Sequence, residues 1–205
     1  MGFAKPIEQY LFGNLLTEIQ VIMYLKDIIR GDYTMKTVVL LYDSSCIYEI
    51  VILNYFLKVT GRDVVFASPD GNAITAMEGY SINTAGVLNA INPTDVELLI
   101  VPGGDITPID KEDIWNYLRL VNKNHGLIAG ICAGVDVLEH AGLLDGIDST
   151  HSTDLDVAVC DNIITARANG YVDFAIETAK KLNLFEDEAD LQETIAFWRE
   201  FQRVE

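Results

Sequence analysis

The stretch Leu127-Ile-Ala-Gly-Ile-Cys-Ala-Gly134 carries the strongest structural signal in the chain. Its first five residues form an apolar run of strand length, and the chain after Cys132 turns directly into helix-like sequence. Gly130 to Gly134 has the form G-x-C-x-G, the nucleophile elbow G-x-S-x-G with cysteine in place of serine. We therefore expect Cys132 between a strand and a helix N-terminus, where the helix dipole favours the reactive thiolate.

Strand-like and helix-like segments alternate on both sides of this stretch. Strands are expected at 37–42, 63–67, 96–101 and 127–131, with strand-like sequence around 157 and at 163–166. Helices are expected at 49–59, 111–124, 171–182 and 187–203, and a small hairpin off the main sheet within 73–92. The alternation predicts an α/β protein with a mainly parallel sheet, whose ligands bind beyond the carboxyl ends of the strands.

The N-terminal segment predicts a separate helical extension. Within 7–29, apolar residues recur at helical spacing at Ile7, Leu11, Leu15, Ile19 and Ile22. Charged residues interrupt this segment, so a membrane span is not expected. We divide the chain into an N-terminal helical extension at 1–34 and an α/β domain at 35–205. The apolar stripe has to be buried on this domain or on a second copy.

Composition narrows the classes of partner. The net charge of −17 argues against nucleic acid and anionic membrane surfaces, because phosphate binding needs clustered Lys and Arg. The three cysteines show no C-x-x-C spacing, so we expect no metal site, no cofactor and a reducing compartment. Without the layout of a signal peptide at its start, the chain is expected to be cytoplasmic.

Backbone donors are expected close to the elbow. Attack on a carbonyl-like carbon leaves charge on an oxygen, which backbone N–H groups can hold. Gly103 and Gly104 follow the strand at 96–101, and Ala133 begins the helix after the elbow. On its own, the Pro-Gly-Gly sequence is equally well explained as a plain turn.

Three histidines are candidates for the base or proton donor. His125 stands at a helix end and is assigned to capping, and His140 lies inside the helix after the elbow and is expected to be exposed. His151 follows a short loop after that helix, so it is the predicted partner of Cys132. No third residue that would orient His151 stands out.

Glu49 is one carboxyl in the first turn of an otherwise apolar predicted helix. It stabilises the helix N-terminus by its charge, or it lies in apolar surroundings near the thiol, with a raised pKa that lets it donate a proton to the sulfur. The residues alone do not separate these two roles.

Together these features resemble the ThiJ/PfpI superfamily over residues 36–183. The matching pieces stand in order, namely the strand at 37–42, Glu49, Ala67–Gly71, Val101–Gly104, Ala129–Gly134, Ala141–Gly146, Thr150-His151, and Ile164–Arg167 leading into Asp173–Ala175. The resemblance implies a flavodoxin-like three-layer sandwich that forms a homodimer and needs no cofactor.

The resemblance also implies roles for individual residues. Cys132 is the elbow nucleophile, Glu49 the acid that hydrogen-bonds its sulfur, and His151 the nearby histidine. The oxyanion and substrate site is lined by Gly103, Gly104 and Ala133, with Arg167 close to the site or to the dimer contact.

Three departures limit the activity that the resemblance implies. Ala133 stands where the protease-like branch has a histidine, which weakens a protease assignment. No histidine follows His151, which argues against glutamine amidotransferase activity. The segment 48–53 lacks the residues of the isonitrile hydratase-like branch.

Three hypotheses for function remain. The first is a cysteine-dependent enzyme of hydrolase, glyoxalase or deglycase type that acts on a carbonyl or carbon–nitrogen bond of a small molecule. The second is a redox-responsive or stress-response protein in which Cys132 is oxidised without turnover. The third is an assembly module whose functional surface is the N-terminal apolar stripe.

Overall fold

We analysed a computed structural model that describes residues 35–203 of the chain. The expected helix at 7–29 lies outside the described residues. Seven strands form one sheet in the order β5-β2-β1-β6-β7-β9-β8, in which only β8 runs antiparallel to its neighbour. Their bounds are β1 Lys36–Leu40, β2 Val64–Ser68, β5 Gly86–Val87, β6 Val96–Val101, β7 Leu127–Ile131, β8 Val157–Cys160 and β9 Ile163–Ala166.

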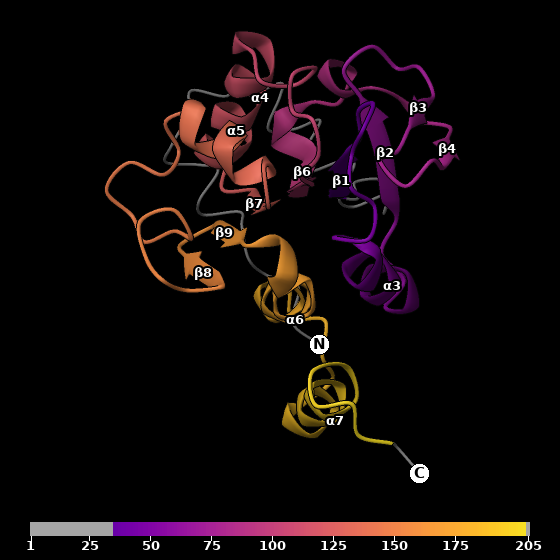
Figure 1. Cartoon of the computed structure of the whole chain (residues 1–205), viewed down its shortest axis with the longest axis vertical. Coiled ribbons are helices and arrows are strands. Elements are labelled where there is room, and N and C mark those ends of the chain that lie inside the picture. The colour runs from indigo at the N-terminus through magenta and orange to yellow at the C-terminus, as the bar shows by residue number, and fades with distance from the viewer. Residues whose placement is uncertain (1–34, 204–205) are drawn as a thin grey trace, which may run out of the picture. The chain divides into compact units, whose positions relative to one another are not determined.

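Helices cover both faces of this sheet, which makes three layers (Figure 1). One face carries α3 (Val51–Val59) and α6 (Tyr171–Lys181), with α7 (Glu188–Trp198) packed outside them. The other face carries α4 (Glu112–Lys123) and α5 (Gly134–His140). Short 3₁₀ turns lie at Leu88–Ala90, Pro93–Asp95 and Ala168–Gly170. The predicted α/β sandwich with a mainly parallel sheet is confirmed.

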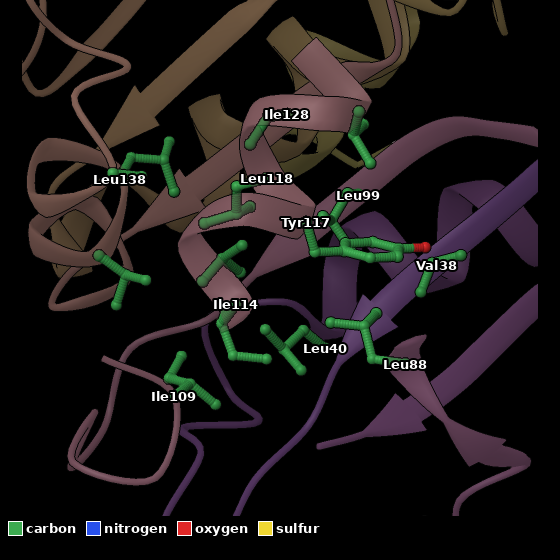
Figure 2. Close-up of a cluster of buried hydrophobic side chains, with 14 of the residues drawn as sticks. Val38, Leu40, Leu88, Leu99, Ile109, Ile114, Tyr117, Leu118, Ile128 and Leu138 are labelled. Atoms are coloured by element: carbon green, nitrogen blue, oxygen red, sulfur yellow. The ribbon is translucent and has the colours of Figure 1, made fainter. Parts of the chain in front are cut away.

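The central strands are mainly apolar because both of their faces are covered. In β1, Val38 and Leu40 pack toward α4 and α5, whereas Val39 packs into the layer of α3 and α6. Figure 2 shows the first of these clusters, in which Tyr117 from α4 lies close to Val38. Alternating burial on two faces explains why the sequence shows continuous apolar runs instead of a polar–apolar alternation.

A small antiparallel hairpin stands apart from the main sheet. It consists of β3 (Ile74–Thr75) and β4 (Ser81–Ile82), within the range where the sequence predicts a hairpin. Backbone hydrogen bonds hold it against the loop after β1: the Ser44 N–H donates to Thr75 O at 2.8 Å, and the Met77 N–H donates to Ser45 O at 3.0 Å. The hairpin therefore supports the loop that leads to Glu49.

The start of α3 differs from the sequence-based expectation. The helix begins at Val51 with Ile50 as N-cap, and its first turn contains no acidic residue. Glu49 therefore lies in the turn before the helix, and its side chain is held at the sheet edge by Gly103. None of the described helices is long and apolar enough to cross a membrane.

Candidate functional site

Cys132 occupies a tight turn between β7 and α5. Its φ is +56°, a left-handed conformation that a non-glycine residue rarely adopts, and its backbone N–H donates to Ala166 O at 2.9 Å. Gly134 makes the turn possible, because a Cβ atom there would lie 2.2 Å from Val101 O. The elbow predicted from the G-x-C-x-G sequence is therefore present in the backbone.

Cys132 and the buried Glu49 carboxyl meet at Gly103. A Cβ atom on Gly103 would lie 2.9 Å from Cys132 Sγ, 2.6 Å from its Cβ and 2.8 Å from Glu49 Oε2. The hydroxyl of Tyr42 holds this loop, with Pro102 O at 2.7 Å and Gly103 O at 2.8 Å. Only glycine fits at this position, which brings the thiol and the carboxyl against the same backbone.

The Glu49 carboxyl is almost fully buried, with 1% of the residue exposed. Its Oε2 accepts the Gly103 N–H at 2.7 Å, while Oε1 has no hydrogen-bond partner among the described residues. Burial raises the pKa of Glu49 above its ordinary value, and the Gly103 N–H opposes that shift. A neutral Glu49 would carry an O–H donor, for which the adjacent sulfur is the acceptor at hand.

The Glu49 carboxyl decides whether the helix N-terminus can lower the pKa of the Cys132 thiol. While Glu49 is ionised, burial and its negative charge raise the pKa of Cys132 to about 11, although the Ala133 N–H opposes the shift. The expectation from the helix N-terminus did not include Glu49. Two acidic groups as close as Glu49 and Cys132 cannot both lose their protons without a large cost in free energy. The thiolate therefore depends on Glu49 being neutral.

Cys132 opens onto a pocket of about 300 Å³. The lining residues are Cys132, Thr150, His151, Ala166 and Arg167. The structure thus places His151 and Arg167 in the same pocket as Cys132. Thr150 and Ala166 were not singled out, although both adjoin predicted site residues.

Both ring nitrogens of His151 face carboxylates on α5. Nδ1 lies 2.8 Å from Glu139 Oε2, and Nε2 lies 3.4 Å from Asp136 Oδ1. The sequence analysis missed both acids, although their spacing of three residues puts them on one side of a helix. The three side chains offer ligand atoms within 4.8 Å of one another, which is a spacing that could hold a metal ion. Glu139 and His151 are exposed and Asp136 is half-buried, and here the two acids position the histidine.

Arg167 is held by backbone carbonyls of the loop before β8. Its Nε donates to Leu155 O at 3.2 Å and its Nη2 to Thr153 O at 3.4 Å. Thr150 anchors the other side of the pocket, because its N–H donates to Thr165 Oγ1 at 3.0 Å. These bonds fix the wall that faces Cys132.

The predicted oxyanion donors are used differently from one another. The Gly103 N–H is taken by Glu49, and the Ala133 N–H is directed to the sulfur of Cys132. Gly104 follows Gly103 directly and pairs as an isolated bridge with Ser45. The Gly104 N–H is therefore a candidate donor to a developing oxyanion, and the Ala133 N–H becomes one once the sulfur has lost its negative charge.

The sequence model of the DJ-1/PfpI family matches residues 35–181. The chain belongs to this family. A deglycase of Thermococcus kodakarensis is 26% identical over 136 residues, which cover 65% of this chain and 80% of that protein. The deglycase PfpI of Pyrococcus furiosus is 28% identical over 120 residues, 58% of this chain and 70% of that one.

A solved structure agrees with the fold of this DJ-1/PfpI protein. The DJ-1 superfamily protein of Agrobacterium tumefaciens superposes with a TM-score of 0.73 at 24% identity, covering 82% of this chain and all of that one. At that identity the likeness concerns the fold. The ThiJ/PfpI resemblance found in the sequence is thus confirmed.

Proposed function

We infer that this DJ-1/PfpI protein is a cysteine-dependent enzyme acting on a carbonyl or carbon–nitrogen bond of a small molecule. The observation that carries the inference is the placement of Cys132 in a left-handed elbow, beside the buried Glu49 and open to a pocket. A strained backbone at such a turn is common where a nucleophile is presented. A structural cysteine would need neither the carboxyl nor the pocket.

Glu49 and Cys132 act as one proton-sharing pair in this proposal. Burial disfavours the charged form of Glu49 more than the hydrogen bonds from Gly103, Cys132 and Tyr48 favour it, so Glu49 holds its proton and donates it as a hydrogen bond to the sulfur. The Ala133 N–H supplies a second bond to the same sulfur. A thiolate with two donors is favoured over the neutral thiol.

The reaction begins with addition of the thiolate to the carbonyl carbon. A carbon–sulfur bond forms, and the electron pair of the C=O bond moves to the oxygen, which the N–H groups of Gly104 and Ala133 hold. His151, whose Nδ1 is held by Glu139, gives the proton from Nε2 that turns the oxyanion into the hydroxyl of a hemithioacetal, and Nε2 has to leave Asp136 to do so. Glu49 is the alternative proton donor.

A pocket of about 300 Å³ suits a small substrate. The relatives named as deglycases support glyoxalase or deglycase chemistry over peptide hydrolysis. Arg167 on the pocket wall lies 3.5 Å from Asp154 and 3.9 Å from Asp156, so it offers hydrogen-bond donors that favour a substrate with a second carbonyl oxygen more than it offers a free positive charge.

Turnover of methylglyoxal tests this proposal. We expect saturable consumption by the unaltered protein, loss of at least about a hundredfold in Cys132→Ser, and unchanged activity in Cys160→Ser, which alters a cysteine at the end of β8. Stable oxidation of Cys132 by peroxide, without turnover of methylglyoxal or a glycated amine, would instead support the redox-responsive alternative.

A further inference from the structure

We propose that Glu78 is a positioning residue for Glu49, so that the β3–β4 hairpin sets the reactivity of Cys132 through it. The inference rests on the proposed function, in which a neutral Glu49 supports the thiolate. Glu78 lies between β3 and β4, a part of the chain for which the sequence predicts only a hairpin. It is not among the residues that line the pocket, and its hydrogen bond is made to the turn that carries Glu49.

The contact that carries the inference is made at the turn before α3. The Tyr48 N–H donates to Glu78 Oε1 at 2.7 Å, one residue before Glu49. Partial burial would raise the pKa of Glu78, but hydrogen bonds from the backbone N–H groups of Tyr48 and Ile47 outweigh it and lower the pKa. Glu78 is therefore a charged acceptor for donors that the chain leaves open just before the helix.

Glu78 holds the turn before α3 and does not cap the helix itself, since its donors Ile47 and Tyr48 precede the N-cap residue. The N-cap residue Ile50 has no side-chain oxygen to accept a backbone N–H, and no side-chain cap is present. Together with the Met77 N–H on Ser45 O, the bond from Tyr48 ties the turn to the hairpin at two points. Those ties fix the backbone from which the Glu49 side chain reaches Gly103.

The charge of Glu78 acts in the same direction as its geometry. Burial is the main cause of the raised pKa of Glu49, hydrogen bonds from Gly103, Cys132 and Tyr48 oppose it, and the negative charge of Glu78 adds a smaller upward shift. The titratable groups around Glu49 are Tyr42, Cys46, Tyr48, Cys132 and Glu78. Glu78 is exposed, so its influence is small and weakened by salt.

Two substitutions separate position from charge. Glu78→Gln keeps an acceptor for the Tyr48 N–H and removes the charge, whereas Glu78→Ala removes both. Glu188→Gln, an exposed acid on α7 that bonds Gln192, is the matched control. The measurement is the rate of Cys132 alkylation by iodoacetamide against pH, followed on the Cys132 peptide by mass spectrometry, with urea unfolding to confirm folding.

We expect the alkylation midpoint of Glu78→Ala to rise by about half a pKa unit, which is about threefold slower labelling below the midpoint. Glu78→Gln should raise it by about half as much at low salt, and the shift should vanish at high salt. Glu188→Gln should match the unaltered protein. If the urea experiment shows that Glu78→Ala is unfolded, the midpoint of Glu78→Gln at low and high salt decides whether Glu78 influences Cys132.

Three results would overturn the inference. If Glu49→Gln moves the midpoint and neither Glu78 variant does, Glu78 is not a positioning residue, while the proposed function stands. If the unaltered protein shows the midpoint of a free thiol, both the proposed function and this inference fail. A midpoint lowered by either Glu78 variant also contradicts it, because the sign is then wrong.

Discussion

Tyr42 shows how a single residue holds the site together. It is 1% exposed, and its hydroxyl faces the carbonyl oxygens of Pro102 and Gly103 at the loop beside the nucleophile. Removing the hydroxyl leaves two buried carbonyls without that donor, which costs about 1–3 kcal/mol. The loop whose Gly103 N–H donates to Glu49 would also lose the anchor that the Tyr42 hydroxyl provides.

We therefore expect Tyr42→Phe to lower the free energy of unfolding in urea by about 1–3 kcal/mol. The control is Tyr80→Phe. Tyr80 is 60% exposed, so the loss of its hydroxyl should change the free energy of unfolding by less than about 0.5 kcal/mol. Equal effects of the two substitutions would mean that the hydroxyl does not anchor the loop.

At the scale of elements, the junction of β7, the elbow and α5 leaves no room for a side chain at Gly134. A Cβ atom there would lie 2.2 Å from Val101 O and 2.9 Å from Pro102 O, both of which are backbone atoms. The helix would have to move away from β6, and the elbow would move with it.

Gly134→Ala should therefore destabilise the fold by more than about 3 kcal/mol or abolish it. Gly61→Ala separates this clash from backbone strain, because Gly61 has a φ of +77° but open space around it. We expect Gly61→Ala to lower the free energy of unfolding by about 1–2 kcal/mol in the same urea experiment. A Gly134→Ala protein as stable as Gly61→Ala would contradict the close packing of elbow and strand.

The same elements show what the sequence could predict. The strands and the elbow were predictable, because doubly covered strands leave continuous apolar runs and G-x-C-x-G is local. The carboxylates that face His151, and the bond from Tyr48 to Glu78, join residues on different elements, so no local pattern encodes them. The raised pKa of Cys132 escaped prediction for the same reason, since it depends on Glu49 across the loop.

For the whole molecule, stability comes from two apolar layers on opposite faces of one sheet. Phe174 in α6 is fully buried in the layer shared with α3, whereas Phe201 near the end of the described chain is 86% exposed. Deleting a buried aromatic ring removes its burial and leaves a cavity.

Phe174→Ala should cost about 3–5 kcal/mol of unfolding free energy. Phe201→Ala, the same change at an exposed position, should cost less than about 0.5 kcal/mol. Both are measured by urea denaturation followed by circular dichroism. A large effect at Phe201 would show that its ring is covered by a contact outside the described residues.

The most direct measurement is the pH dependence of Cys132 alkylation by iodoacetamide in the unaltered protein and in Glu49→Gln. If a neutral Glu49 supports the thiolate, the midpoint lies below the ~8.5 of a free thiol and rises in Glu49→Gln, whose amide is the weaker donor. If Glu49 is ionised beside the thiol, its charge keeps the pKa of Cys132 raised toward about 11. A midpoint above that of a free thiol that falls in Glu49→Gln would contradict the proposed nucleophile.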